Sequence, residues 1–259
     1  MSGLHDLSLA SVAGDPRSAV HRRDPRVKLL GLGSVTLVAV SAPVSAWPAY
    51  AGCAAVLTGV AIAARLSPAT IWRRARVILP LVLFAAAFIP FVREGRVVAS
   101  VGPFDLTAEG LSTFAGVAAK TAIGTVSAVL LGATTSFPDV LRALERLRTP
   151  RLFVLVAMLT YRYVFVVAGE VRRMRTAMRA RGYRPRHLLQ AGPVGHAAGA
   201  LFLRAHGRGE RIYLAMAARG FTGTMPQAVP LRLCAADVLF LLAAAVPLVA
   251  LRLTLEVMA

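Results

Sequence analysis

The chain has few charged residues, and few of these are acidic. Only 16% of its 259 residues are charged, whereas an ordinary soluble domain carries about a quarter. Hydrophobic residues make up 57% of the chain. There are 12 acidic side chains against 30 Lys and Arg, so the formal net charge is +18. This composition excludes an ordinary water-soluble fold and predicts an integral membrane protein.

Residue patterns that bind metals or catalyse reactions are also missing. The two cysteines lie far apart, within or beside apolar runs, and form no zinc or redox motif. The five histidines include no i, i+4 pair and have no carboxylate or thiolate cluster nearby. The chain lacks a Gly-x-x-x-x-Gly-Lys-Ser/Thr phosphate-binding loop, a Gly-x-Ser-x-Gly motif and a His-Glu-x-x-His motif. We therefore expect no catalytic residue, no metal site and no cofactor held by this chain, and a membrane enzyme is the weaker alternative.

Five apolar runs approach the ~20 residues that a helix needs to cross a bilayer. The runs are residues 29–46, the stretch after Pro48 that ends at residue 64, and residues 77–92, 111–135 and 233–251. A further run, residues 152–168, is seventeen residues long and nearly all apolar. The number of predicted spans therefore depends on how this last run is interpreted.

The distribution of positive charge predicts the orientation, because Lys and Arg accumulate in cytoplasmic loops. Residues 1–28 hold five basic and three acidic side chains, whereas the loop after the third run holds two basic and three acidic ones. Residues 138–230 hold sixteen Arg and four acidic residues, and so carry two thirds of the net charge. We therefore expect the N-terminus and residues 138–230 in the cytoplasm. Since topology explains the charge, nucleic acid is not an expected partner.

The run at residues 152–168 conflicts with this topology if it crosses the membrane. The Arg-rich segment that follows would then lie outside, and Arg162 near the middle of the run would cost about 2.5–3.5 kcal/mol at the bilayer centre. We interpret the run as a helix along the cytoplasmic face. The predicted fold is thus an all-α integral membrane protein with five transmembrane helices, and six is the alternative.

The predicted domains follow from these runs. They are a cytoplasmic N-terminal segment (1–28), the first four transmembrane helices (29–136), a helical cytoplasmic domain (137–230), and the last transmembrane helix with a short C-terminus (231–259). Within the cytoplasmic domain, residues 138–148 have an amphipathic pattern, and Thr135 or Ser136 is suited to cap that helix. A basic helix, a loop and two further helices are expected after the apolar run.

Two heptapeptides in this domain repeat each other. Residues 177–183 (AMRARGY) and 215–221 (AMAARGF) match at an offset of 38 residues. Arg followed by Gly is ordinary helix-stop chemistry, because Arg offsets the helix dipole and Gly adopts a left-handed conformation. Two copies also suit docking to a partner that is itself present twice. Met178 and Met216 would then make adaptable apolar contacts, and Arg181 and Arg219 would pair bidentately with carboxylates.

The two Ala-Arg-Gly motifs resemble the signature of the transmembrane T component of energy-coupling factor (ECF) transporters. The motifs are Ala180-Arg181-Gly182 and Ala218-Arg219-Gly220, and three other stretches resemble the same family: Asp24-Pro25-Arg26-Val27-Lys28-Leu29, residues 134–150 and Tyr161-Arg162-Tyr163. The chain length and the polar segment at residues 5–21 are most similar to the cobalt or nickel branch, CbiQ.

This resemblance implies a non-catalytic scaffold in a bacterial cell membrane. The scaffold would join two ABC-type ATPases to a membrane-embedded, substrate-binding S component, and residues 137–230 would form its coupling domain. Arg181 and Arg219 would anchor the two coupling helices on the ATPases, and the neighbouring Ala and Gly residues would permit a close fit. ATP would bind only to the partner subunits. Cobalt is the first expected substrate and nickel the second; a T component for a vitamin and a conventional ABC permease subunit are the alternatives.

Two ionisable residues lie inside predicted spans, where a lone charge is unfavourable. They are Lys120 in the fourth span and Asp237 in the fifth. One hypothesis is that they form an intramembrane pair. Alternatively, Lys120 faces the S component or extends its ammonium toward the membrane surface.

Overall fold

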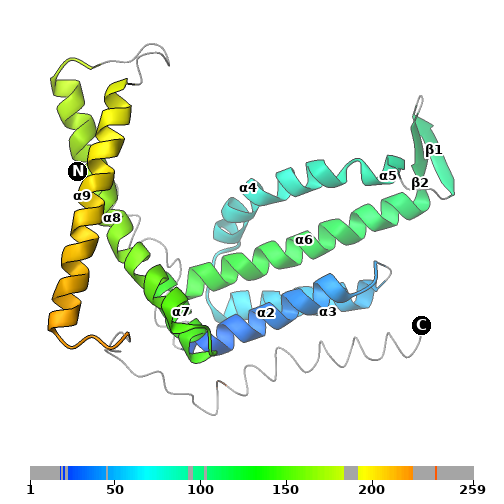
Figure 1. Cartoon of the computed structure of the whole chain (residues 1–259). Coiled ribbons are helices and arrows are strands. Elements are labelled where there is room, and N and C mark those ends of the chain that lie inside the picture. Colours follow the sequence, from blue (N-terminus) through cyan, green and yellow to red (C-terminus); the bar gives the residue numbers. More distant parts are fainter. Residues whose placement is uncertain are drawn as a thin grey trace. The chain divides into compact units, whose positions relative to one another are not determined.

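The computed structural model describes residues 18, 20, 23–44, 46–92, 96–101, 104–183, 192–223 and 237. The described chain is mainly helical and contains one short β-hairpin (Figure 1). Its contacts divide the chain into two compact units, which we call the first unit (Met1–Ala143 with Leu231–Ala259) and the second unit (Leu144–Pro230). The second unit overlaps the predicted cytoplasmic domain (137–230) and begins seven residues later; the assignment of the units to membrane and cytoplasm stays a prediction.

Helices of the first unit overlap the first four apolar runs that were predicted as spans. They are α2 (Pro25–Ser41), α3 (Trp47–Ala63), α4 (Pro68–Ala86) with the short α5 (Ile89–Val92), and α6 (Ala108–Thr134). Proline occupies the first turn of α2, α3 and α4, where its missing N–H leaves no helical hydrogen bond broken. α4 begins before the predicted run and contains Pro80. The fifth predicted span lies outside the described residues except for Asp237.

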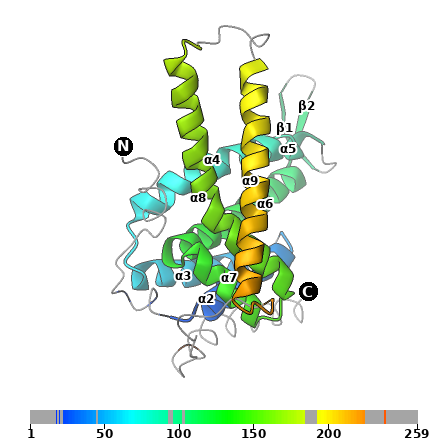
Figure 2. The ribbon, with the colours of Figure 1, turned by 60° about the vertical axis from the view of Figure 1, so that its left-hand side comes forward.

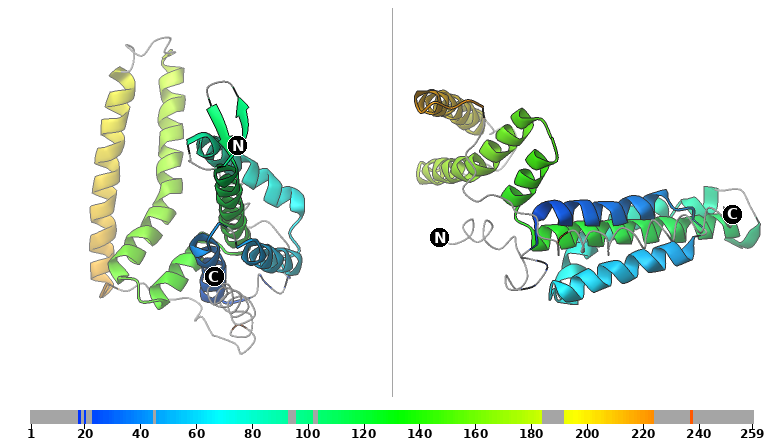
Figure 3. Two further views of the ribbon diagram at one scale, coloured as in Figure 1. Left: turned by 90° about the vertical axis from the view of Figure 1, so that its right-hand side faces the viewer. Right: turned by 90° about the horizontal axis from the view of Figure 1, so that it is seen from below.

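Helix α6 is the central element of the first unit and packs along α2, α3 and α4 (Figure 3). The core between these helices consists largely of small or branched side chains that are almost fully buried, among them Val35, Ala39, Cys53, Leu130 and Ala133. Small residues allow the helix backbones to approach closely. At Gly116, for example, a Cβ would lie only 2.9 Å from Cγ1 of Val44.

The hairpin before α6 was not predicted from the sequence. β1 (Val97–Val101) pairs antiparallel with β2 (Phe104–Thr107), and Val101 lies opposite Phe104. Thr107 ends β2 and caps α6, because its Oγ1 accepts a hydrogen bond of 3.2 Å from the N–H of Gly110. The hairpin thus fixes the start of the central helix.

Helix α7 (Phe137–Arg146) follows α6, and the boundary between the two units falls inside it, after Ala143. The predicted cap at Ser136 is confirmed: its Oγ donates to Oδ2 of Asp139 at 2.5 Å and accepts from the Asp139 N–H at 3.4 Å. These reciprocal bonds stabilise the first turn of an amphipathic helix whose apolar side, including Leu141, is buried in the first unit.

The second unit contains two long helices where the sequence analysis expects four shorter ones. α8 (Arg151–Ala180) joins the apolar run to the basic helix without a break, and α9 (Gly192–Ala218) joins the last two expected helices. Gly169, Gly207 and Gly209 lie near the expected breaks, but an internal Gly weakens a helix by only about 1 kcal/mol and does not end it. α8 and α9 lie side by side in opposite directions (Figure 2).

Two of the described helices, α6 and α8, are long and apolar enough to cross a membrane by length and composition. In α8, only 6% of the apolar window is buried within the structure, against 33% in α6. α8 includes the run at residues 152–168 on which the five-span and six-span predictions differ. Most of its apolar surface is therefore not buried by the described chain, and the number of spans stays a prediction.

Candidate functional site

The two Ala-Arg-Gly motifs close their helices with the same backbone structure. In the first motif, Gly182 has a φ of +79°, its N–H bonds to the Arg179 carbonyl at 3.0 Å, and the Tyr183 N–H bonds to the Met178 carbonyl at 3.0 Å. This pattern is a Schellman motif, in which a left-handed Gly turns the last two amides back onto the helix. The helix-stop interpretation of the repeat is therefore correct for this copy.

The second copy repeats the first almost bond for bond. Gly220 has a φ of +74°, its N–H bonds to the Ala217 carbonyl at 3.0 Å, and the Phe221 N–H bonds to the Met216 carbonyl at 3.1 Å. Only Gly adopts this φ without strain, which explains the Gly in both heptapeptides. The sequence repeat is thus a structural repeat.

The side chains of the motifs divide into two groups. The Met and the aromatic residue of each copy are half-buried, and each pair lines a cavity between α8 and α9: Met178 with Tyr183 in one case, Met216 with Phe221 in the other. An apolar contact of this kind commonly accompanies a Schellman motif. The remaining motif residues are exposed, namely Ala180, Arg181, Gly182, Ala218, Arg219 and Gly220. The two Met residues are therefore less available to a partner than the Ala-Arg-Gly residues.

Helices α8 and α9 place the two motifs at opposite ends of the pair. One cavity is lined by the last part of α8 and the first part of α9, and another, of about 500 Å³, by the first part of α8 and the last part of α9. α9 has 27 residues, which corresponds to a length of about 40 Å. The exposed Arg181 and Arg219 are therefore separated by about the length of α9.

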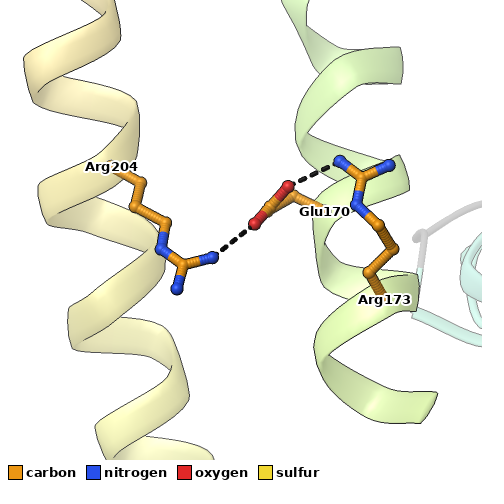
Figure 4. Close-up of polar contacts among 3 residues, drawn as sticks. All are labelled: Glu170, Arg173 and Arg204. Atoms are coloured by element: carbon orange, nitrogen blue, oxygen red, sulfur yellow. Dashed lines mark hydrogen bonds and ion pairs between the residues drawn. The ribbon is translucent and has the colours of Figure 1, made fainter. Parts of the chain in front are cut away.

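One ion-pair network joins the two helices between the motifs (Figure 4). Glu170 of α8 accepts a hydrogen bond from Arg204 of α9 at 2.6 Å and another from Arg173 of α8 at 2.5 Å. The bonds from Arg173 and then Arg204 hold the pKa of Glu170 below its usual value. The sequence analysis missed this carboxylate, although Glu170 is the one acidic residue between Glu145 and Glu210.

Positive charge surrounds both motifs. Five further Arg side chains are exposed on the last three turns of α8 and near the end of α9: Arg172, Arg173, Arg175, Arg179 and Arg211. Neither Arg181 nor Arg219 forms an ion pair with another described residue. Such an exposed cationic surface is complementary to a partner with acidic side chains.

Lys120 and Asp237, the predicted intramembrane pair, each contact a different group in the structure. The Lys120 ammonium donates a hydrogen bond of 2.9 Å to the carbonyl oxygen of Val40, in α2. Residue Asp237 is 3% exposed, and its carboxylate lies 3.6 Å from the guanidinium of Arg23. The structure therefore does not bring Lys120 and Asp237 together, and each charge has a local explanation.

No group of three or more His, Cys, Asp or Glu side chains within the described ranges is arranged to hold a metal ion. His196 and His206 lie in α9, and the remaining histidines fall outside those ranges. His206 is near Glu210, one turn further along the same helix.

Comparisons of the sequence with known proteins show the family that the two Ala-Arg-Gly motifs indicate. A family described as cobalt transport protein, CbiQ, matches residues 16–230. The cobalt transport protein CbiQ of Rhodobacter capsulatus is 32% identical over 231 residues, which cover 85% of this chain and 87% of that protein.

Two longer proteins share part of the chain. A provisionally named fused cobalt transport protein, CbiMQ, of Methanocorpusculum labreanum is 31% identical over 122 residues, or 47% of this chain and 20% of that protein. A protein of Bifidobacterium longum, provisionally named an ABC transporter ATP-binding protein, is 30% identical over 180 residues, or 65% of this chain and 23% of that protein. The chain thus spans less than a quarter of either longer relative.

Proposed function

Because the chain belongs to the CbiQ family of cobalt transport proteins, we propose that it couples ATP hydrolysis on two partner ATPases to import through a separate S component. Membership of this family makes the chain a non-catalytic, membrane-embedded transporter subunit. In ECF terms, the proposed role is that of the T component.

The observation that carries the proposal is the pair of matched helix ends. Two exposed arginines stand on identical Schellman motifs, about 40 Å apart on one antiparallel helix pair. A duplicated, spaced docking element suits two copies of one partner. The Bifidobacterium relative, whose name is that of an ATP-binding protein, supports ATPases as this partner.

The chemistry of docking follows from the exposed residues. Each guanidinium would form a bidentate pair with a carboxylate in a groove of one ATPase, which fixes orientation as well as position. Gly182 and Gly220 have no side chain, and Ala180 and Ala218 have small ones, so the partner backbone can approach closely. When the ATPases close on ATP, the two anchored ends would move and the α8–α9 pair would tilt.

The proposed substrate is the cobalt ion, on the strength of the names of the two cobalt transport relatives. Nickel is the second choice. The ion would bind to the S component, and ATP to the ATPases, so this chain would hold neither. Uptake of radiolabelled Co²⁺ by cells that express the complete transporter tests the substrate, with excess Ni²⁺ as competitor.

The proposed location is a bacterial cell membrane with the N-terminus and the second unit on the cytoplasmic side. The excess of arginine in residues 138–230 supports this orientation. A reporter that is active only in the cytoplasm, fused near Gly192, tests it. An inactive reporter at this position, in a fusion that is made and inserted normally, would reject the orientation and favour the six-span topology.

Charge reversal at the two arginines tests docking directly. Arg181→Glu with Arg219→Glu should abolish co-purification of the ATPases, because each carboxylate of the partner would then face a like charge. Arg172→Glu with Arg211→Glu is the comparison variant: it changes the net charge equally at exposed positions outside the motifs, and so should weaken co-purification much less than the Arg181/Arg219 variant does. If the Arg181/Arg219 variant retains the ATPases and transports normally, the docking proposal is wrong.

A further inference from the structure

Lys28 occupies an unusual position for a lysine. It lies in the first turn of α2, is only 2% exposed, and donates a hydrogen bond of 3.0 Å to the carbonyl oxygen of Thr134, the last residue of α6. Thr134 is 106 residues away in the sequence. Burial lowers the pKa of Lys28 to about 8, against the opposing attraction of three carboxylates.

The three carboxylates near Lys28 come from different parts of the first unit. In order of their effect on Lys28 they are Asp139 in α7, Asp24 at the cap of α2, and Asp237 in the region of the last predicted span. Asp24 and Asp237 are themselves buried. The buried ammonium is bonded to the last carbonyl of α6 and attracted by carboxylates of α7 and of the α2 cap, so it holds these segments together.

Asp139 is the most informative of the three. It belongs to the first turn of α7, where Ser136 and Arg142 also hold its carboxylate, Arg142 at 2.8 Å. α7 connects the two units, and its first half is anchored in the first unit by Leu141 and Ala143, at 5% and 0% exposure. The second crossing of the chain, at residues 230 and 231, lies outside the described residues. α7 is thus the described covalent path from the coupling domain to the membrane helices.

We propose that Lys28 is a positioning residue for transport, which fixes the end of α6 and the start of α7 to α2, so that movement of the second unit is passed to the membrane helices. This inference rests on the proposed function, because it assumes that the second unit is moved by the ATPases. Without the ammonium, the hydrogen bond between Lys28 and the end of α6 is lost. A displacement of α7 would then distort only the junction of α6 and α7 and would not move α2.

The test is uptake of Co²⁺ per ATP hydrolysed in the complete transporter reconstituted in liposomes. Lys28→Met should assemble and hydrolyse ATP, with uptake per ATP lower by about tenfold or more, the scale expected for loss of a hydrogen bond to a charged group. Lys28→Arg should restore much of the ratio, because it keeps the buried positive charge. Tyr50→Phe is the matched control: it removes another buried side-chain donor to a backbone carbonyl, that of Pro43, away from α7.

Unchanged uptake per ATP in Lys28→Met, or an equal loss in Tyr50→Phe, would overturn the inference. If Lys28→Met does not assemble, Asp139→Asn replaces it, since this variant removes the strongest attraction on Lys28 and keeps the side-chain shape; normal coupling there would also overturn the inference. A wild-type complex that binds no ATPase, or takes up no Co²⁺, would instead reject the proposed function.

Discussion

Glu170 and Arg204 join the two helices that carry the Ala-Arg-Gly motifs. Their side chains meet at 2.6 Å although 34 residues separate them in the sequence, and Arg173 holds the second carboxylate oxygen (Figure 4). The contact ties α8 to α9 between the two motifs. It therefore helps to hold together the helix pair that separates Arg181 from Arg219, a separation on which simultaneous docking to two partners depends.

Replacing Glu170 should remove a pH-dependent contribution to stability. The arginines lower the pKa of Glu170 in the folded chain, so its contribution is fully present above the ordinary Glu pKa and is lost as pH falls through the lower, folded value. We therefore expect wild type to have a higher melting temperature than Glu170→Gln at pH 7, measured for the purified chain in detergent. This difference in melting temperature should narrow as the pH falls toward and below 4. Glu210→Gln, an exposed substitution on α9, should show a smaller difference at pH 7. A Glu170→Gln difference that does not change with pH would contradict this account.

The two Schellman glycines should be intolerant of a side chain for a backbone reason. Gly182→Ala and Gly220→Ala force a left-handed φ on alanine, which costs about 1–2 kcal/mol although nothing lies within 4 Å of the new Cβ. Gly199→Ala, inside α9 and equally unobstructed, should instead stabilise the helix by up to about 1 kcal/mol. Denaturant unfolding measures the change in the free energy of unfolding for each of the three variants. If this change has the same sign in all three, the left-handed role of Gly182 and Gly220 is refuted.

Gly110 should be intolerant of a side chain for a different reason, the proximity of another backbone. A Cβ at this position would lie 2.7 Å from Cα and 2.9 Å from the carbonyl oxygen of Pro90, so the start of α6 must shift. We expect Gly110→Ala to lower the free energy of unfolding by about 1–3 kcal/mol. Gly132→Ala, at an open position of the same helix, is the control and should be neutral or stabilising. Equal stability of the two variants would show that the contact with Pro90 is not tight.

Replacing the docking arginines by lysine tests the geometry of the pairing and not only its charge. Lysine keeps the positive charge but cannot form a bidentate pair with a carboxylate. Arg181→Lys and Arg219→Lys should therefore each weaken ATPase binding by about tenfold, as expected when one charged hydrogen bond is lost. Titration of the purified ATPase onto the chain in nanodiscs measures this loss. Arg172→Lys should bind like the wild type; if the motif variants do so too, bidentate pairing is excluded.

Features set by neighbouring residues could be predicted from the sequence. The cap at Ser136 follows from a Ser placed three residues before an Asp, and the helix ends at Gly182 and Gly220 follow from Gly after an Arg. The doubled motif also led to the family that the comparisons confirm. In each case the physical cause lies within a few residues, where the sequence displays it directly.

Contacts between distant residues could not be predicted in this way. Nothing near Lys28 or Glu170 in the sequence specifies Thr134 or Arg204 as a partner, because helix packing creates those contacts. The sequence analysis expected two helices in place of α8, because the composition changes from apolar to basic near residue 168. Backbone hydrogen bonds do not depend on that change, so the helix continues.

Helix α9 buries none of its residues within this chain, and large apolar side chains such as Phe202, Leu203 and Leu214 remain at least 63% exposed. None of the described residues covers them, and we expect lipid or a partner protein to do so. A copy made in excess of its partners would display this surface to the proteases that remove unassembled subunits. The cellular amount of the chain should therefore follow the supply of its partners, and quality control would adjust the stoichiometry of the transporter.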